Sequence, residues 1–181
     1  VENGILENPY YRMNEYVARD FLSQDFIFCK TFSLHKQEKY TYELCCDGID
    51  TVADIYINGT LIKKVKNMHL RYKIECSGVL KDGENKIEIY FHSAIKYIES
   101  YIPQPDKEIH FTACGAMDRN QYIRKAHSMF GWDWGPQLPD MGIWRDIYII
   151  GIETASIEYI KTSQNHGNGE VEVLARAFVK L

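Results

Sequence analysis

The chain has 181 residues, of which 45% are hydrophobic and 25% are charged, and its formal net charge is −4. This composition is typical of a globular protein with one complete domain and part of another, and it excludes a disordered chain. The weak negative charge, without a long basic run, does not favour nucleic acid or an anionic membrane as a partner. No apolar run approaches the ~18 residues of a membrane span.

The cysteines and histidines do not suggest a metal site. The five cysteines are odd in number and contain no C-x-x-C pair, and the six histidines contain no H-x-x-x-H pair. This argues against a zinc site and against a disulfide framework, so we expect no metal and no other cofactor. Reduced cysteines and the absence of a basic-then-apolar pattern in residues 1–4 favour a cytoplasmic protein. The cysteines are Cys29, Cys45, Cys46, Cys76 and Cys114.

The first half of the chain reads as one helix followed by short strands. Asn14 is expected to cap a helix over residues 15–22. Residues 47–50 read as a turn, and Asn58-Gly59 is a strong signal for a two-residue hairpin. Alternating apolar residues predict strands at 26–34, 40–46, 52–57, 61–65, 71–76 and 86–92.

After residue 92 the period of the apolar residues changes. Ser93 is expected to cap a helix in which Ile95, Ile98 and Ile102 recur three and four residues apart. Pro103 and Pro105 should stop this helix.

Residues 103–142 are irregular and rich in glycine, proline and aromatic residues. A connection of this length inside a compact domain is more often functional than idle. Within it, Asp118 is expected to cap a short helix through residues 124–125, and residues 142–150 return to a strand.

Two more strands are predicted at 156–162 and 170–178, joined by the turn-like residues 165–169. They read as the opening of a second β-domain. Many short strands with few helices predict an all-β fold, a two-sheet β-sandwich with a long decorated loop. The expected domains are residues 1–152 and 153–181.

The most informative stretch is Phe130-Gly131-Trp132-Asp133-Trp134-Gly135-Pro136. An extended backbone would place the two indoles on one side and Asp133 on the other, although the glycines and the proline favour a shaped loop. Such a loop suits a sugar, because a carboxylate accepts from hydroxyls and an indole covers a C–H face. Alternatively, the tryptophans plug one end of the sandwich and Asp133 accepts from backbone amides.

Several motifs together resemble glycoside hydrolase family two. Residues 47–53, Asp-Gly-Ile-Asp-Thr-Val-Ala, with Ile57-Asn58-Gly59 resemble a signature of the N-terminal domain of that family. Arg124-Lys125, the Trp-Asp-Trp stretch and Gly142-Ile143-Trp144-Arg145 resemble its β-mannosidase branch, as do residues 8–11 and 67–68. The resemblance covers most of residues 5–152.

The resemblance implies a jelly-roll sandwich of the galactose-binding type, then an immunoglobulin-like domain whose first strands are residues 153–181, then a (β/α)₈ barrel. It implies a retaining exo-glycosidase that acts on terminal β-mannosides. The catalytic carboxylates would lie in the barrel, which needs ~250 residues by itself, so no catalytic residue is assigned here and the fragment should be inactive. This chain would dock against that barrel.

The resemblance also assigns roles to five residues. Asp133 would accept hydrogen bonds from the terminal sugar, Trp132 would line the pocket, and Trp134 would pack. Arg124 and Lys125 either support the loop by pairing with acidic groups or are solvated. The alternatives are a free-standing carbohydrate-binding module, or the same role in a β-galactosidase, β-glucuronidase or exo-glucosaminidase of the family.

Overall fold

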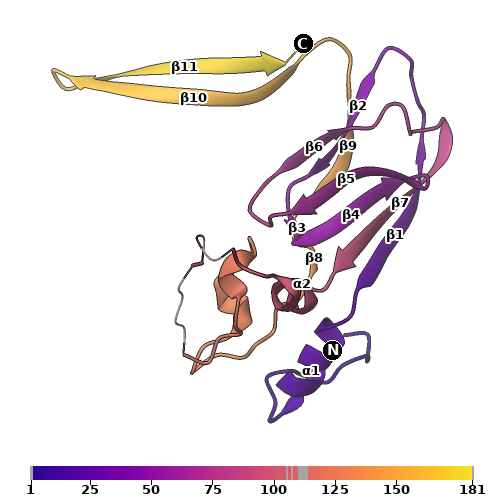
Figure 1. Ribbon diagram of the computed structural model, residues 1–181. Coiled ribbons are helices and arrows are strands. Elements are labelled where there is room, and N and C mark those ends of the chain that lie inside the picture. The colour runs from indigo at the N-terminus through magenta and orange to yellow at the C-terminus, as the bar shows by residue number, and fades with distance from the viewer. Residues whose placement is uncertain (1, 105, 107, 110–113, 181) are drawn as a thin grey trace.

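A computed structural model describes residues 2–104, 106, 108–109 and 114–180. Two antiparallel sheets face each other as a sandwich (Figure 1), which confirms the predicted all-β fold. The four-stranded sheet has the order β1 (Phe26–Leu34), β7 (Gly83–His92), β4 (Val52–Ile57), β5 (Thr60–Lys66). The three-stranded sheet has the order β6 (Tyr72–Glu75), β2 (Thr41–Cys46), β9 (Ile147–Ile152).

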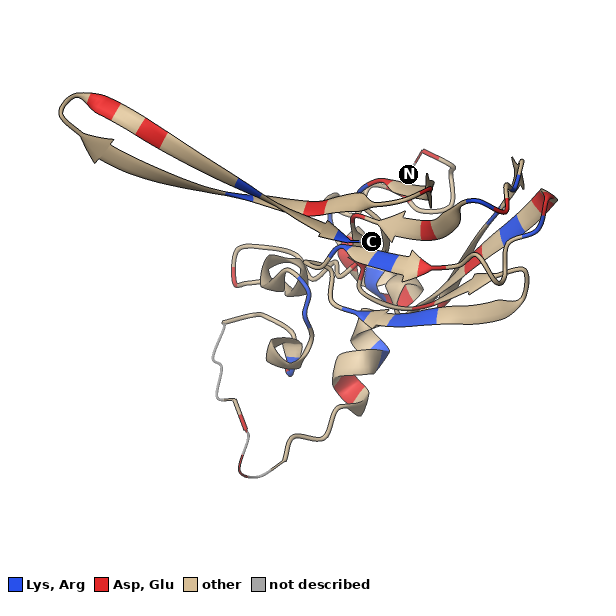
Figure 2. Cartoon of the chain, turned by 90° about the horizontal axis from the view of Figure 1, so that it is seen from above, with Lys and Arg blue, Asp and Glu red and all other residues tan. Residues whose placement is uncertain are grey.

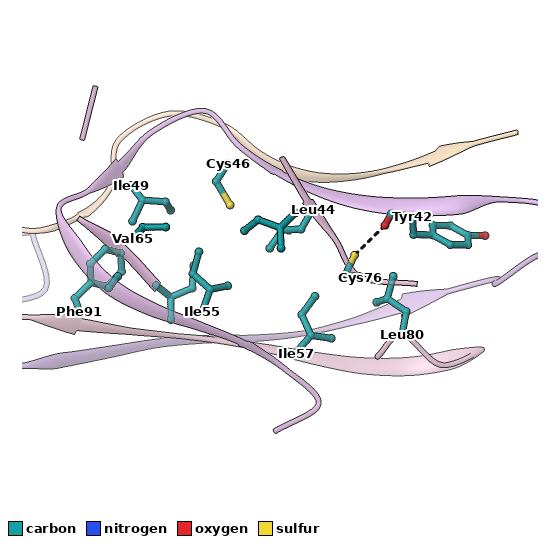
Figure 3. Packing of buried hydrophobic residues seen from close by; sticks show 13 residues of the cluster. Tyr42, Leu44, Cys46, Ile49, Ile55, Ile57, Val65, Cys76, Leu80 and Phe91 are labelled. Carbon is teal, nitrogen blue, oxygen red and sulfur yellow. Dashed lines mark hydrogen bonds between the residues drawn. The ribbon is translucent and has the colours of Figure 1, made fainter. Parts of the chain in front are cut away.

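The core lies between these two sheets. Figure 3 shows Leu44 and Cys46 of β2 across from Ile55 and Ile57 of β4, and all four are at most 2% exposed. Strand β4 alternates strictly between buried and half-buried residues, as expected for one face turned to the core. The strand expected over residues 52–57 is confirmed, and its core-facing residues are Ala53, Ile55 and Ile57.

The Asn58-Gly59 hairpin is confirmed. Asn58 and Gly59 have φ of 51° and 80°, and Ile57 pairs with Thr60 across the turn. Positive φ at both central residues is the geometry that matches the twist of two antiparallel strands.

The structure differs from the prediction around residues 47–50. Ile49–Asp50 forms a short strand, β3, paired with β8 (Gly142–Ile143), so the expected turn is wrong in its second half. Ile49 is fully buried, and pairing with Ile143 brings it into the core. The strand expected over residues 142–150 is accordingly divided into β8 and β9.

The helices expected near residues 15–22 and after Ser93 are both present, but only the second has the expected cap. Helix α1 (Asn14–Leu22) starts after Met13, and the Asn14 side chain donates to the Asn8 carbonyl at 3.0 Å instead of capping. Helix α2 (Ala94–Ser100) is capped by Ser93, whose Oγ accepts from the Lys96 amide at 3.5 Å.

The stop of α2 is only partly as predicted. Ile102 lies past the helix end and is 86% exposed, so it does not extend the apolar face of Ile95 and Ile98. Pro105 lies outside the described residues, as do Val1 and Leu181, the outer limits of the two expected domains.

The described residues of the long connection include the short 3₁₀ helices η2 (Asn120–Tyr122) and η3 (His127–Phe130). The prediction of a helix from Asp118 through residues 124–125 is wrong. Arg119 adopts a left-handed conformation (φ 65°), which a right-handed helix cannot contain, and only the short η2 follows it. Ile123 and Phe130 of this connection pack with Ala94 and Ile98 of α2 in a second, smaller core.

Strands β10 (Ser156–Gly167) and β11 (Glu170–Lys180) form a separate hairpin that extends away from the sandwich (Figures 1 and 2). Its large apolar side chains are largely exposed, and Lys180 donates to Glu43 of β2 at 2.7 Å. An isolated two-stranded hairpin is only marginally stable in water, which fits a hairpin that belongs to a larger sheet. The assignment of this hairpin to a partial second domain stays a prediction. No helix in the described ranges is long and apolar enough to cross a membrane.

Candidate functional site

The Trp-Asp-Trp stretch is a tight turn. The Trp132 amide donates to the Gly135 carbonyl at 3.0 Å, and the Gly135 amide donates back to the Trp132 carbonyl at 3.3 Å. Asp133 and Trp134 are therefore the two central residues of a two-residue turn. The shaped loop is confirmed, and the side-to-side alternation of an extended strand does not apply.

The side chains of this turn lie at the surface. Trp132 is 42% exposed, Trp134 is 83% exposed, and Asp133 is exposed between them. The interpretation as a plug of the sandwich is wrong, because the aromatic residue of this stretch that enters the core is Phe130. Trp134, expected to pack, is the more exposed of the two indoles, since it occupies a central turn position.

Gln137 attaches the turn to helix α1. Its backbone amide donates to Glu15 Oε1 at 2.8 Å, and its side-chain Oε1 accepts from the Arg19 guanidinium. Its Nε2 donates to the Gly115 carbonyl at 2.9 Å. Sequence reasoning missed these residues, since Glu15 and Gln137 are 122 positions apart and neither belongs to a recognisable motif.

Gly115 lies directly against the turn. It has φ of 74°, and a Cβ at this position would lie 2.9 Å from the Asp133 amide nitrogen and from the Trp132 carbonyl. Only a glycine allows both this backbone conformation and this approach. The bond from Gln137 to Glu15 of α1 and the close approach of Gly115 thus hold the turn that carries Asp133 in place.

The two predicted loop-support residues behave differently. Lys125 is 2% exposed and its Nζ pairs with Asp50 Oδ2, while Asp140 Oδ1 lies 3.8 Å away, so Lys125 is not solvated. Arg124 is exposed, and its backbone carbonyl accepts from the Met68 amide at 3.0 Å. Of the two alternatives, pairing with acidic groups therefore applies to Lys125 and solvation to the side chain of Arg124.

A cavity of about 450 Å³, called here the front cavity, lies between the turn and the N-terminal segment. It combines an acceptor (Asp133) and donors (Arg12 and Arg19) with aromatic rings, a mixture that suits a ligand with several hydroxyl groups. Within the described ranges, no group of three or more His, Cys, Asp or Glu side chains could hold a metal ion. The lining includes Tyr10, Arg12, Glu15, Tyr16, Arg19, Trp132, Asp133 and Trp134.

The sandwich and its decorated loop define a β-sandwich of the galactose-binding type. The family model described as the glycosyl hydrolase 2 galactose-binding domain-like family matches residues 1–145. The chain belongs to this family.

Several of the similar relatives are named β-mannosidase. β-Mannosidase of Mus musculus is 32% identical over 175 residues, 88% of this chain and 19% of the relative, and β-mannosidase of Capra hircus is 31% identical over 91% of this chain and 19% of the relative. The crystal structure of a β-D-mannosidase from Dictyoglomus thermophilum superposes with a TM-score of 0.88 at 28% identity, covering 99% of this chain and 22% of that one.

A more distant structure shares the fold. An exo-chitosanase of Amycolatopsis orientalis matches with a TM-score of 0.68 at 16% identity, over 98% of this chain and 19% of that one. The chain spans about a fifth of the length of the relatives that it matches.

Proposed function

We propose that this chain is the N-terminal part of a retaining exo-glycosidase that removes terminal β-mannosides, and that its Trp-Asp-Trp turn forms one wall of the substrate pocket. The observation that carries the proposal is the position of Asp133. It stands exposed at the tip of a turn, between two accessible indoles and beside the front cavity.

The role of Asp133 follows from its chemistry. A carboxylate accepts hydrogen bonds from sugar hydroxyls, and each such bond to a charged group contributes ~1.5–3 kcal/mol. If these bonds strengthen as the sugar ring distorts, they lower the barrier in addition to holding the substrate. Trp132 and Trp134 provide apolar faces for the C–H side of the ring.

The hydrolytic carboxylates belong, in this proposal, to a barrel outside the chain. A (β/α)₈ barrel takes ~250 residues, more than this chain has in total. The sandwich docks against that barrel, and the β10–β11 hairpin is the beginning of an immunoglobulin-like domain between them. The apolar side chains of the hairpin would then be covered by the remainder of that domain.

The test is hydrolysis of nitrophenyl β-mannoside by the full-length product of the gene. We expect activity in that enzyme, none in the isolated chain, and turnover lowered by orders of magnitude in Asp133→Ala. The melting temperature should stay nearly unchanged, because an exposed turn side chain contributes little to stability. Normal turnover in Asp133→Ala would refute the role of this residue.

The same assay separates the neighbouring specificities of the family. Nitrophenyl β-galactoside, β-glucuronide and β-glucosaminide are the alternative substrates. Faster hydrolysis of one of them would change the predicted sugar specificity but not the proposed role of the turn. A free-standing carbohydrate-binding module is the alternative from another class. It predicts that calorimetry on the isolated chain detects mannobiose at millimolar or tighter affinity.

A further inference from the structure

We propose that the sandwich is completed by one more strand, which a part of the same polypeptide outside residues 1–181 supplies, and which lies beside β9 and faces β1. An apolar cleft of about 470 Å³, called here the side cleft, marks the place of this strand. The cleft is lined from both sheets, by residues that include Phe28, Phe32 and Ile89 on one side and Leu44, Ile147 and Ile149 on the other.

The two sheets of the sandwich are unequal. One has the order β1-β7-β4-β5 and the other has the order β6-β2-β9. Strand β2 lies across from β4 (Figure 3), and β7 and β9, their neighbours, line the side cleft together. Strand β9 is therefore opposite β7, and β1 has no strand opposite it among the described residues.

This gap leaves apolar and backbone groups uncovered. Phe28 of β1 pairs with Ile89, which is 2% exposed, so Phe28 occupies a core-facing position, and yet its side chain is 42% exposed. The outer edge of β9 pairs with no other described strand, and the N–H and C=O groups on that edge can accept a new strand. A strand beside β9 would pair these groups and cover Phe28 at the same time, which a helix would not do.

Lys30 indicates what the added strand carries. It pairs with Ile87 in the register of β1 and β7, so it stands on the same face of β1 as Phe28. Among the described residues, the lining of the side cleft includes no other charged side chain, and no acidic side chain pairs with Lys30. An Asp or Glu on the added strand, flanked by apolar residues, would complement this face of β1.

The same polypeptide is the favoured source of the strand. The chain spans about a fifth of the length of the relatives that it matches, so most of a protein of that length lies outside residues 1–181. A core that includes Leu44 needs its cover from folding onward, and a covalently linked strand is present at a high effective concentration. A second copy or a separate protein would leave the cleft open whenever it dissociates.

Lys30 could instead protect the edge on its own, because an inward-pointing charge discourages other strands from pairing. Lys63 offers a matched comparison. It lies on β5, the other edge strand of the same sheet, and it pairs with the buried Ile55 but does not line the side cleft. A protective charge works with either sign, whereas an ion pair becomes a repulsion when one charge is reversed. Charge reversal therefore separates the two roles.

The first measurement is carbodiimide cross-linking of the full-length protein, followed by mass spectrometry. A carbodiimide joins an amine directly to a carboxylate, so it reports ion pairs. We expect Lys30 to be joined to an Asp or Glu outside residues 1–181, and Lys64 to be joined to Asp54, 2.9 Å away, as the internal control. A detected Lys64–Asp54 link without a link from Lys30 would overturn the proposal. So would a link from Lys30 to a second copy, identified in a mixture of isotope-labelled and unlabelled protein.

The second measurement is hydrogen exchange of the β9 amides in the full-length protein, read residue by residue. Successive amides of an antiparallel strand point to opposite sides, so an occupied edge protects all of them and a free edge only alternate ones. We expect continuous protection over Ile147–Ile152. Lys30→Glu should speed this exchange about tenfold or more, and Lys63→Glu should leave it unchanged.

Alternating protection in the unsubstituted protein, or equal exchange in the two variants, would also overturn the proposal. If Lys30→Glu does not fold, the cross-link in the unsubstituted protein decides. The inference shares with the proposed function only the premise that the chain belongs to a longer protein. Neither measurement depends on turnover, so a failure here is distinct from a failure of the assigned hydrolysis.

Discussion

Lys125 and Asp50 form an ion pair inside the protein, 75 positions apart in the sequence. The Lys125 side chain is 0% exposed and that of Asp50 is 4% exposed. Asp50 belongs to β3 and Lys125 to the long connection, so this pair joins the sandwich to the segment that carries the Trp-Asp-Trp turn.

The first prediction concerns the loss of this pair. Lys125→Met should lower the free energy of unfolding by ~3–5 kcal/mol, because it leaves the Asp50 carboxylate buried without its counter-ion. Urea denaturation of the chain measures the change.

The matched control is Lys64→Met. Lys64 pairs with Asp54 at 2.9 Å, but its side chain is 68% exposed, so its loss should cost at most ~1 kcal/mol. Adding Asp50→Asn to Lys125→Met should recover part of the stability, because it removes the stranded charge. Equal effects of the two lysine substitutions would contradict the account of a buried pair.

The second prediction concerns the approach of Gly115 to the turn. Gly115→Ala should destabilise the chain, and it should shift the indole N–H resonances of Trp132 and Trp134. The new Cβ would meet backbone atoms of Trp132 and Asp133 at 2.9 Å, so the turn must move. Denaturation and nuclear magnetic resonance spectra give the two readouts.

Gly59→Ala is the control that separates the cost of a left-handed backbone from the cost of the steric contact. Gly59 has a similar φ of 80°, but a Cβ there would meet nothing within 4 Å. It should cost only the ~1–2 kcal/mol of a left-handed conformation, whereas Gly115→Ala adds ~1–3 kcal/mol for the steric overlap. A Gly115→Ala variant no less stable than Gly59→Ala, with unchanged indole signals, would argue against the close approach.

The third prediction concerns the reactivity of the thiols. Burial raises the pKa of Cys46 to about 12 and that of Cys76 to about 11, and it also raises the pKa of Cys45. A raised pKa means that these groups remain uncharged thiols near pH 8, and only the thiolate is a good nucleophile.

Alkylation with iodoacetamide at about pH 8, followed by mass spectrometry, tests this. We expect the native chain to be modified at Cys29 and Cys114, which are exposed, and all five cysteines to react in denaturant. Modification of Cys46 in the native chain as fast as Cys29 would show that this side of the core opens readily.

The fold was largely predictable because its signals are local. Alternation predicted the strands, Asn58-Gly59 predicted its hairpin, and Ser93 predicted a helix start. One local signal failed because of a distant partner, since Ile49 joined β3 by pairing with Ile143. Asn14 did not cap α1 because its amide bonds to Asn8.

The sequence by itself determined the β-sandwich and the family resemblance, since residue order and period two carry this information, and it indicated the Trp-Asp-Trp stretch as the candidate site. Only the tertiary structure decided that both indoles are accessible and that Lys125 is buried. These properties depend on contacts between segments up to 122 positions apart. A single sequence does not encode such contacts in any local pattern, because burial and pairing arise only when the chain is folded.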